Sequence, residues 1–424
     1  MRELGRLLRG QRDYRLMLGA GLISLTGDWI LRVGLAFQVY VLTGSTLASG
    51  GMMLASFLPH ILLGSLAGVF VDRWDRRRTM IGVNLLHVAT LMPLIVVRDA
   101  GDLWIVYGVA LTQSCLQQFF VPAEQSLVPR LVRPDQLISA NALTGQTHDI
   151  SRLTGAALGG LLAGFGGLPL LAIADAATYL LSAGLLARMR HQSPRLLAER
   201  LGLRHAVRRL RAEWAEGLRI SMGGSGLRLL FAFGVVTSIG EGAMGTLFAP
   251  FVRDELGGSE VTYGWIVSSQ AVGGIVGGLV AAAFGRRLGA VRMWGLGALT
   301  FGLIDLTLFC YPLWSGALWP AFVCMVVVGV PGAFITAGTL TVFQQLTDDA
   351  SRGRVFGAFF AAEGGACLIG ILAAGVLGEA VGIIPILVVQ GLAYVVAGLV
   401  VLALRRAVSP PKAQPEQVPQ PVAG

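Results

Sequence analysis

Long apolar segments alternate with short polar connections along most of the chain. Twelve of these segments reach about 20 residues, the length that an α-helix needs to cross the hydrocarbon core of a bilayer. Because lipid offers the backbone no hydrogen-bond partners, such segments predict membrane-spanning helices and an all-α integral membrane protein. The predicted spans cover residues 17–41, 47–71, 80–98, 103–122, 137–166, 168–188, 229–252, 262–285, 291–313, 317–341, 354–378 and 382–404.

Basic residues gather in alternate connections. With the N-terminus in the cytoplasm, 29 of the 33 Lys and Arg residues fall on the cytoplasmic side, and only Arg98 and Arg253 fall on the other. Connections rich in Lys and Arg stay in the cytoplasm. We therefore expect a multi-pass protein of the bacterial inner (cell) membrane with both termini cytoplasmic.

The chain divides in the middle. Segments 50–76 and 264–290 repeat one another, with Gly50 matching Gly264 and Gly64 matching Gly278. Duplicated halves are typical of transporters, which bind substrate between the halves at mid-membrane. The predicted parts are a six-helix half at 1–190, a basic cytoplasmic linker at 191–226, a second six-helix half at 227–406 and a disordered cytoplasmic tail at 407–424.

Composition narrows the function classes. Hydrophobic residues make up 54% and charged residues 13% of the chain, and the mean hydropathy is +0.69, so the bilayer is the expected solvent. The net charge of +9 does not predict a nucleic-acid partner, because no basic stripe with interleaved aromatic residues is present. Motifs for hydrolases, metal centres and nucleotide phosphates are missing, so we expect no enzyme activity, metal or cofactor, and energy from an ion gradient.

The loop after the second span carries a recognisable motif. It reads Gly68-Val-Phe-Val-Asp72-Arg73-Trp-Asp75-Arg76-Arg77-Arg78. This resembles the Gly-x-Leu-Ala-Asp-Arg-x-Gly-Arg-Arg motif of the major facilitator superfamily, with Asp75 in place of the second glycine. The resemblance implies two pseudo-symmetric six-helix halves and a working monomer.

The same resemblance implies a gating role for this loop. Asp72 would meet the N-terminus of the eleventh helix, and Arg76 or Arg77 would pair with Glu124. Such contacts, together with Gly68 and Arg73, would hold the halves together on the cytoplasmic side. The alternative is that the arginines only determine topology.

Three further stretches are similar to one branch of the superfamily, the drug:proton antiporters that include macrolide-efflux and enterobactin-exporting proteins. They are FVPAEQSLVPRLV at 120–132, LISANAL at 137–143 and RGRVFG at 352–357. The branch implies export of a small amphipathic molecule, such as a drug, antibiotic or siderophore, in exchange for protons. The fifth span departs from the efflux motif because Ala156 stands where proline is usual. Import of a metabolite or siderophore, or a non-transporting receptor or scaffold, therefore stay open as alternatives.

Ionisable residues at membrane depth are costly and indicate function. Asp28 and Arg32 lie four residues apart on the first span, where they can pair on one helix face. Asp149 and Arg152 lie three apart on the fifth span. Glu241 and Glu363 lie central in the seventh and eleventh spans, next to glycines. We expect these six residues to carry proton or substrate coupling, against the alternative of structural ion pairs and packing networks.

Small residues at helical spacing allow backbones to approach. Gly155, Gly159 and Gly160 on the fifth span, and Gly274 and Gly278 on the eighth, are predicted to form the helix-packing interface between the halves. Ordinary packing within one half is the alternative.

Overall fold

The structure is a computed structural model that describes residues 10–71, 74–190 and 214–405. This described part is helical throughout and contains no β-strand. Ten helical segments in it are long and apolar enough to cross a membrane. One of them, α6, contains two of the predicted spans, and α5 is a further long helix that contains more polar residues. The twelve-helix fold class expected from the sequence is thereby confirmed.

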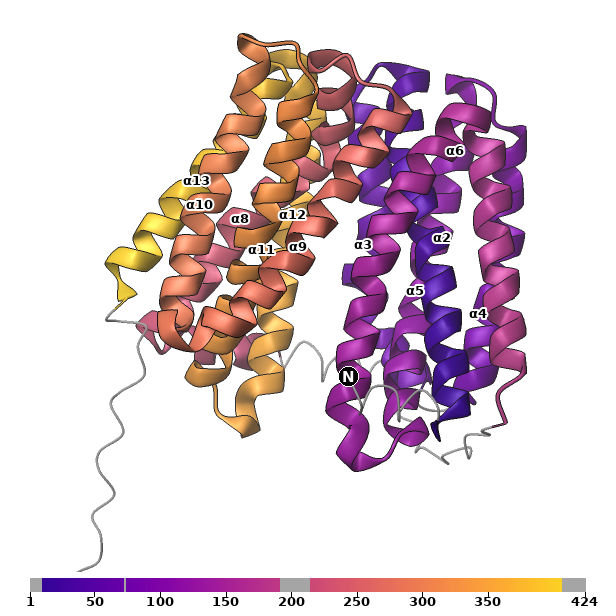
Figure 1. Ribbon diagram of the computed structural model, residues 1–424, viewed down its shortest axis with the longest axis horizontal. Helices are drawn as coiled ribbons and strands as arrows, with labels where there is room; N and C mark the ends of the chain where they lie inside the picture. The colour runs from indigo at the N-terminus through magenta and orange to yellow at the C-terminus, as the bar shows by residue number, and fades with distance from the viewer. Residues whose placement is uncertain (1–9, 72–73, 191–213, 406–424) are drawn as a thin grey trace, which may run out of the picture.

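The helices form two bundles that stand side by side (Figure 1). The first bundle contains α2 (Arg12–Thr43), α3 (Thr46–Val71), α4 (Arg76–Leu91), α5 (Leu103–Leu131) and α6 (Leu137–Ala187). The second contains α8 (Ser225–Pro250), α9 (Glu260–Leu288), α10 (Ala290–Cys310), α11 (Trp319–Leu346), α12 (Asp349–Val381) and α13 (Ile383–Ala403). Part of the predicted linker and the whole predicted tail lie outside the described residues.

The longest element, α6, is a helical hairpin. Gly167 interrupts it with φ 55° and ψ −149°, a conformation that glycine adopts without steric cost. Pro169 follows near the start of the second limb, where its missing N–H costs no helical hydrogen bond. The sequence predicted a boundary at this residue, between spans 137–166 and 168–188.

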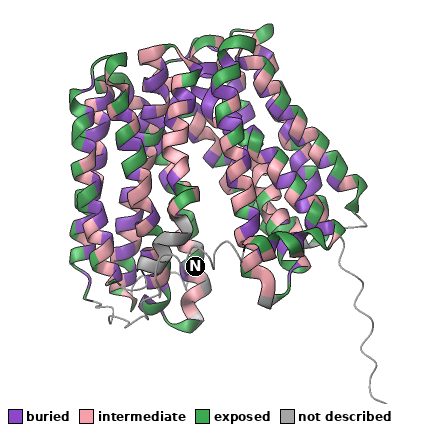
Figure 2. Ribbon diagram, turned by 180° about the vertical axis from the view of Figure 1, so that it is seen from behind, coloured by how far each residue is buried: buried purple, intermediate pink, exposed green. Residues whose placement is uncertain are grey.

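Buried residues face the inside of each bundle, and exposed residues cover the outside (Figure 2). Many exposed side chains are large and apolar, such as Phe165, Leu279 and Val389, which suits a surface in contact with lipid. One buried cluster joins the two bundles. It includes Val33 and Phe37 of α2, and the centroids of the Phe37 ring and of the Tyr263 ring on α9 are 5.4 Å apart.

The two ends of the molecule differ in charge. We call the end where α2 begins and α13 ends the basic end, since Arg76, Arg77 and Arg78 at the start of α4, Arg130 in the last turn of α5 and Arg133 after α5 lie there. The opposite end is the far end. The α6 hairpin begins and ends at the basic end and turns at the far end, at Gly167.

Candidate functional site

Each half carries one carboxylate midway along its first helix. Asp28 lies on α2 and Glu241 on α8, and each is preceded by a glycine. Hydrocarbon does not solvate a charged side chain, so a carboxylate at this depth needs water or a polar partner. Both carboxylates have a tyrosine hydroxyl as that partner.

In the first half, the Tyr179 hydroxyl of α6 donates a hydrogen bond to Asp28 Oδ1. The His87 ring of α4 stacks on the Tyr179 ring, with centroids 4.4 Å apart and an interplanar angle of 3°. His87 Nδ1 is hydrogen-bonded to Gln113 Oε1 of α5, and the Gln113 amide donates to Thr90 Oγ1 at 3.0 Å. A continuous polar group therefore extends from Asp28 across three neighbouring helices.

A second carboxylate belongs to this group. Asp175 of α6 is 0% exposed and accepts a hydrogen bond from Thr178 Oγ1 at 3.2 Å. A Cβ atom at Gly27 would overlap both of these side chains, so the glycine before Asp28 lets α2 and α6 lie this close. Gly27 thus has a specific task, which is to bring α6 against the carboxylate-bearing turn of α2.

In the second half, the Tyr394 hydroxyl of α13 donates to Glu241 Oε1 at 2.6 Å. The Phe301 ring of α10 packs on the Tyr394 ring at a centroid distance of 4.6 Å. One turn before Tyr394, the Gln390 amide donates to Asp305 Oδ2 at 2.8 Å. Asp305 and Gln390 are each 2% exposed, so this hydrogen bond is shielded from solvent.

Glu241 differs from Asp28 in its access to solvent. Asp28 is half-buried, whereas Glu241 is exposed although it lies midway along a membrane-spanning helix. An exposed carboxylate at this depth is stable only where water reaches it. Glu241 is therefore more open to its surroundings than Asp28 is.

The expected Asp28–Arg32 ion pair is wrong. Within the described chain no ion pair joins the two residues, because Tyr179 takes the Asp28 carboxylate and the Arg32 guanidinium lies over the Trp29 ring, 5.0 Å from its centroid. Arg32 is exposed. Its positive charge still acts on Asp28 through space, without a bond between the two side chains.

Asp149 and Arg152 are likewise not paired, although the structure describes both residues. Arg152 extends from α6 towards the second half, where its Nη2 lies 3.5 Å from the position of a Cβ atom on Gly274. Its Nε is buried and has no hydrogen-bond partner among the described residues. Arg152 therefore presents an uncompensated donor at the boundary between the halves, and it does not bond to Asp28.

Glu363 lies on α12 and faces α8. Its Oε1 lies 2.9 Å from the position of a Cβ atom on Gly234. The Glu363 side chain is half-buried. Cys367, one turn further on α12, interacts electrostatically with both Glu363 and Glu241. The structure thus places Glu241 and Glu363 in one half and Asp28 and Arg152 in the other.

The predicted gating loop is described only in part. Asp72 and Arg73 lie outside the described residues, and Gly68 lies within α3, where its surroundings are also not described. The described hydrogen bonds of Arg76 and Arg77 stay in the first half: Arg76 Nε donates to Ser126 Oγ at 2.7 Å, and Arg77 Nε donates to the Leu186 carbonyl at 2.8 Å.

These bonds correct the expected contacts with Glu124. Arg77 satisfies a carbonyl at the end of α6, where a cation is favoured by the helix dipole. Glu124 instead faces α2, with Oε1 3.0 Å from the position of a Cβ atom on Gly21.

The predicted glycine interface is only partly a contact between halves. Gly160 is such a contact, because a Cβ atom on Gly264 of α9 would lie 2.7 Å from Gly160 Cα. Gly155 and Gly159 pack against the backbone of α2 within their own half, which corrects that part of the prediction. Gly274 faces the Arg152 side chain, and a Cβ atom on Gly278 would meet nothing within 4 Å.

Polar contacts between the halves gather at the far end, and no pattern in the sequence predicts them. The Tyr40 hydroxyl donates to Asp254 Oδ2, and the Ser45 hydroxyl donates to Glu379 Oε1. Thr46 Oγ1 donates to the Gly375 carbonyl at 3.0 Å. These side chains stand at the ends of spans, where polar residues are ordinary and indicate no particular partner.

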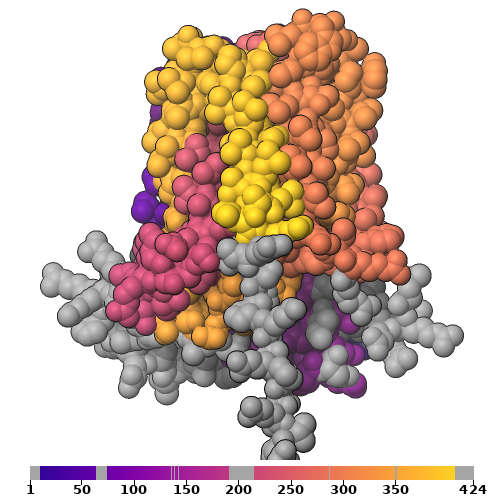
Figure 3. Space-filling model, turned by 90° about the vertical axis from the view of Figure 1, so that its left-hand side faces the viewer, coloured from indigo at the N-terminus to yellow at the C-terminus, as the bar shows by residue number. Residues whose placement is uncertain are grey.

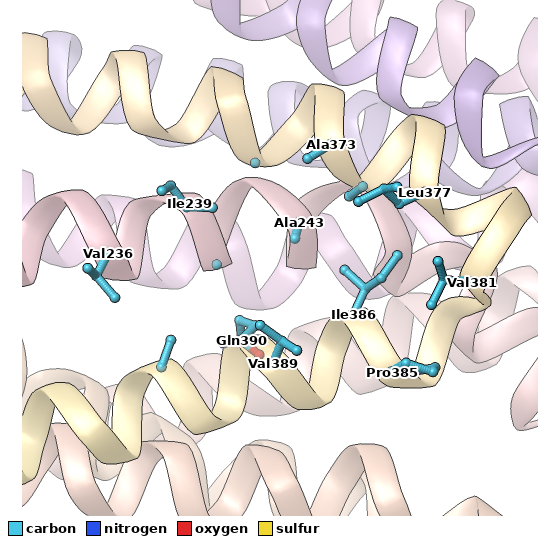
Figure 4. A pocket seen from close by; sticks show the side chains of 14 residues that line it. Val236, Ile239, Ala243, Ala373, Leu377, Val381, Pro385, Ile386, Val389 and Gln390 are labelled. Atoms are coloured by element: carbon cyan, nitrogen blue, oxygen red, sulfur yellow. The ribbon is translucent and has the colours of Figure 1, made fainter.

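An apolar pocket of 480 Å³ lies in the second half between α8, α12 and α13 (Figure 4). Figure 3 shows this face, on which α8 is visible between α12 and α13. Val236, Ile239 and Val389 line the pocket, and Gln390 and Gly240 lie at its inner side. Gly240, the residue that precedes Glu241 on α8, thus lines the pocket, and Glu241 itself does not.

The family is decided by a comparison of the whole chain. A family model described as a transmembrane secretion effector matches residues 9–422. The chain belongs to this family of the major facilitator superfamily. The protein is therefore a membrane transporter of small molecules and not an enzyme.

Relatives of this transporter cover most of its length. Macrolide efflux protein A of Streptococcus pyogenes is 25% identical over 370 residues, which are 85% of this chain and 88% of the relative. The multidrug efflux pump Tap of Mycobacterium bovis is 28% identical and covers 92% of each chain. A bacterial homologue of the iron transporter ferroportin, solved in its inward-facing state, has the same fold, with a TM-score of 0.72, 17% identity and coverage of 94% and 99%.

Proposed function

We propose that the protein exports a small amphipathic molecule across the bacterial inner membrane by alternating access, in exchange for protons. It acts as a monomer, with both termini and the basic end in the cytoplasm. The observation that carries this proposal is the pair of tyrosine-bonded carboxylates, Asp28 and Glu241, one midway along the first helix of each half. Carboxylates at this depth are retained where they bind an ion or a cationic cargo.

The distribution of contacts supports alternating access. The halves touch at the far end, and the described part of the chain has no hydrogen bond between them near the basic end. With the basic end in the cytoplasm, this arrangement corresponds to a carrier that is closed to the outside. Rocking of one half against the other around the central site would then expose it to the opposite side.

The likeness to named efflux proteins supports the outward direction and the amphipathic cargo. Both relatives described above are efflux proteins by name, and they match nearly the whole chain. The apolar pocket, lined by Gly240 next to Glu241 in the chain, offers space for an apolar body, which suits the apolar part of an amphipathic molecule. The loop residues Asp72, Arg73, Arg76 and Arg77 are proposed to hold the cytoplasmic side closed in the opposite state.

Everted membrane vesicles test the exchange directly. Vesicles from expressing cells, with an acidified lumen, should accumulate radiolabelled erythromycin, and nigericin, which collapses the pH difference, should abolish the accumulation. Valinomycin, which removes only the electrical potential, serves as the matched control. Accumulation that is indifferent to nigericin would reject proton exchange.

Substitution of the first carboxylate tests its role. Asp28→Asn removes the titratable group but keeps the shape and the ability to accept from Tyr179. We expect uphill transport to disappear while expression and elution as a folded monomer are kept. Full transport by this variant would remove Asp28 from the mechanism.

Import is the second candidate function. The observation that favours it is Ala156 in place of the proline that efflux members carry, and Ala156 lies at the contact with α9, 0% exposed. Faster uptake of a labelled siderophore into intact cells in acidic medium, without drug efflux, would select this alternative.

A further inference from the structure

The two tyrosines occupy equivalent places in the two halves. Tyr179 lies 151 residues after its carboxylate, and Tyr394 lies 153 residues after its own. Both tyrosines stand on the last helical segment of their half, one turn after Asp175 and Gln390 respectively. In both halves the tyrosine ring is packed against a ring from the third helix, His87 in the first and Phe301 in the second.

The backbone repeats this arrangement. Gly27 precedes Asp28, and Gly240 precedes Glu241. A Cβ atom at Gly27 would overlap Asp175, and a Cβ atom at Gly240 would lie 2.7 Å from Gln390 Cγ. In each half a glycine thus lets the last helix approach the first at the level of the carboxylate. In both halves the tyrosine hydroxyl is hydrogen-bonded to the carboxylate where the two helices approach in this way.

We propose that Tyr179 and Tyr394 are matched positioning residues, one for each half, that orient the coupling carboxylates and set the pH at which these carboxylates load. This inference rests on the proposed function and adds residues that sequence reasoning did not find. Tyr179 is 3% exposed and Tyr394 is 6% exposed, so each phenol ring is held in place by the packing around it. A phenol that donates to a carboxylate favours the charged form of that carboxylate.

The charged and titratable residues around the two carboxylates differ. Around Asp28 they come from four helices, and they are Arg32 of α2, Glu124 of α5, Asp175 and Tyr179 of α6, and His87 of α4 behind the tyrosine. Around Glu241 they are Tyr394 of α13, Asp305 of α10, and Glu363 and Cys367 of α12. The first site contains a permanent cation and the second contains none among the described residues. The same tyrosine device therefore operates in two different fields, so the two carboxylates load at different pH.

Infrared titration of the purified protein in lipid tests the proposal without any cargo. The protonated-carboxyl band that is lost in Asp28→Asn reports on Asp28. In Tyr179→Phe the midpoint of this band's titration should rise by about one pH unit. A hydrogen bond to a charged group contributes at least about 1.5 kcal/mol, and about 1.4 kcal/mol corresponds to one pKa unit. Tyr394→Phe should do the same for the band lost in Glu241→Gln.

Tyr107→Phe is the matched control. Its hydroxyl donates to the Ala48 carbonyl at 3.0 Å, so the substitution removes a similar hydrogen bond without touching a carboxylate. We expect no shift of either band. Equal shifts in Tyr107→Phe and Tyr179→Phe, or no shift in Tyr179→Phe, would overturn the proposal.

A fluorinated tyrosine at position 179 keeps the inference testable if Tyr179→Phe does not fold. Fluorination strengthens the phenol as a donor without changing its shape, so the Asp28 band should move to lower pH. An unchanged band in that variant would contradict the proposal. Because these bands are measured without transport, a protein that moves no cargo would reject the proposed function but leave this result standing.

Discussion

Among the described residues, the two halves pack backbone against backbone at the far end and meet only through single side chains towards the basic end, and one helix pair shows both extremes. At the far end of α9, a Cβ atom on Gly264 would lie 2.6 Å from the Ala156 carbonyl oxygen of α6. One turn further, Ser268 Oγ donates to the Leu153 carbonyl at 2.5 Å. Beyond that only the Arg152 side chain reaches Gly274, and Gly278 faces open space.

The pair of α3 and α12 repeats the gradient. At the far end, a Cβ atom on Gly50 would lie 3.1 Å from Gly375 Cα. Nearer the basic end, only the Ile61 side chain bridges to Gly364, at 3.0 Å from its Cβ position. Backbone contact thus gives way to side-chain contact along both pairs. Glycines with the same sequence spacing therefore have different roles: at the far end they allow the two halves to pack closely, and towards the basic end they lie where the halves are apart.

The strongest way to break this comparison is to lock the far end. In a background without Cys115, Cys310, Cys324 and Cys367, Ser45→Cys with Glu379→Cys places two thiols where a hydrogen bond now joins the halves. A short bifunctional thiol reagent should abolish transport completely, and each single cysteine should transport normally after the same treatment. Transport that survives cross-linking would show that the far end does not open.

A smaller but still large effect is expected from Gly264→Val. The added side chain has no room against the α6 backbone, and overpacking of this kind costs about 1–3 kcal/mol. The apparent unfolding temperature in detergent should fall, and the halves should separate at the far end. An unchanged unfolding temperature would mean that the contact yields without strain.

Tyr40→Phe sharpens the comparison more gently. It removes the donor to Asp254 but keeps the packed ring, so it should weaken the far-end closure by about 1–3 kcal/mol. A cysteine at Ser49, which is buried now, should then react faster with a membrane-impermeant maleimide added from outside. The matched variant Tyr107→Phe should leave that rate as it was.

The smallest effect is expected at the basic end. Gly278→Ala adds a methyl group where nothing lies within 4 Å. The free energy of unfolding should therefore change by no more than about 0.5 kcal/mol, and the unfolding temperature should hardly move. Gly264→Ala is the matched substitution on the same helix, and it should be clearly destabilising. Similar losses from both alanines would remove the distinction between the two ends.

Much of the fold follows from sequence because its signals are local. Span length, charge between spans and the Gly167 break each lie within a few residues of where they act. Asp28 and Glu241 are also visible in the sequence, since a carboxylate in an apolar segment stands out whatever surrounds it.

The partners of these carboxylates could not be predicted. Tyr179 and Tyr394 look like ordinary aromatic residues of apolar helices, and their role depends on how those helices rotate against α2 and α8. The same limit explains the wrong pairing of Asp28 with Arg32. Helical spacing made contact possible, but a better donor on another helix occupies the carboxylate.

The hairpin turn of α6 has a mechanical consequence. Its first limb carries Gly160, which touches the other half, and its second limb carries Tyr179, which holds Asp28. A single non-helical residue, Gly167, joins the two limbs, so they are expected to move together as one rigid unit. A tilt that the other half imposes on the first limb is then transmitted to the Tyr179 phenol on the second, so the geometry at Asp28 changes as the two halves rock against one another.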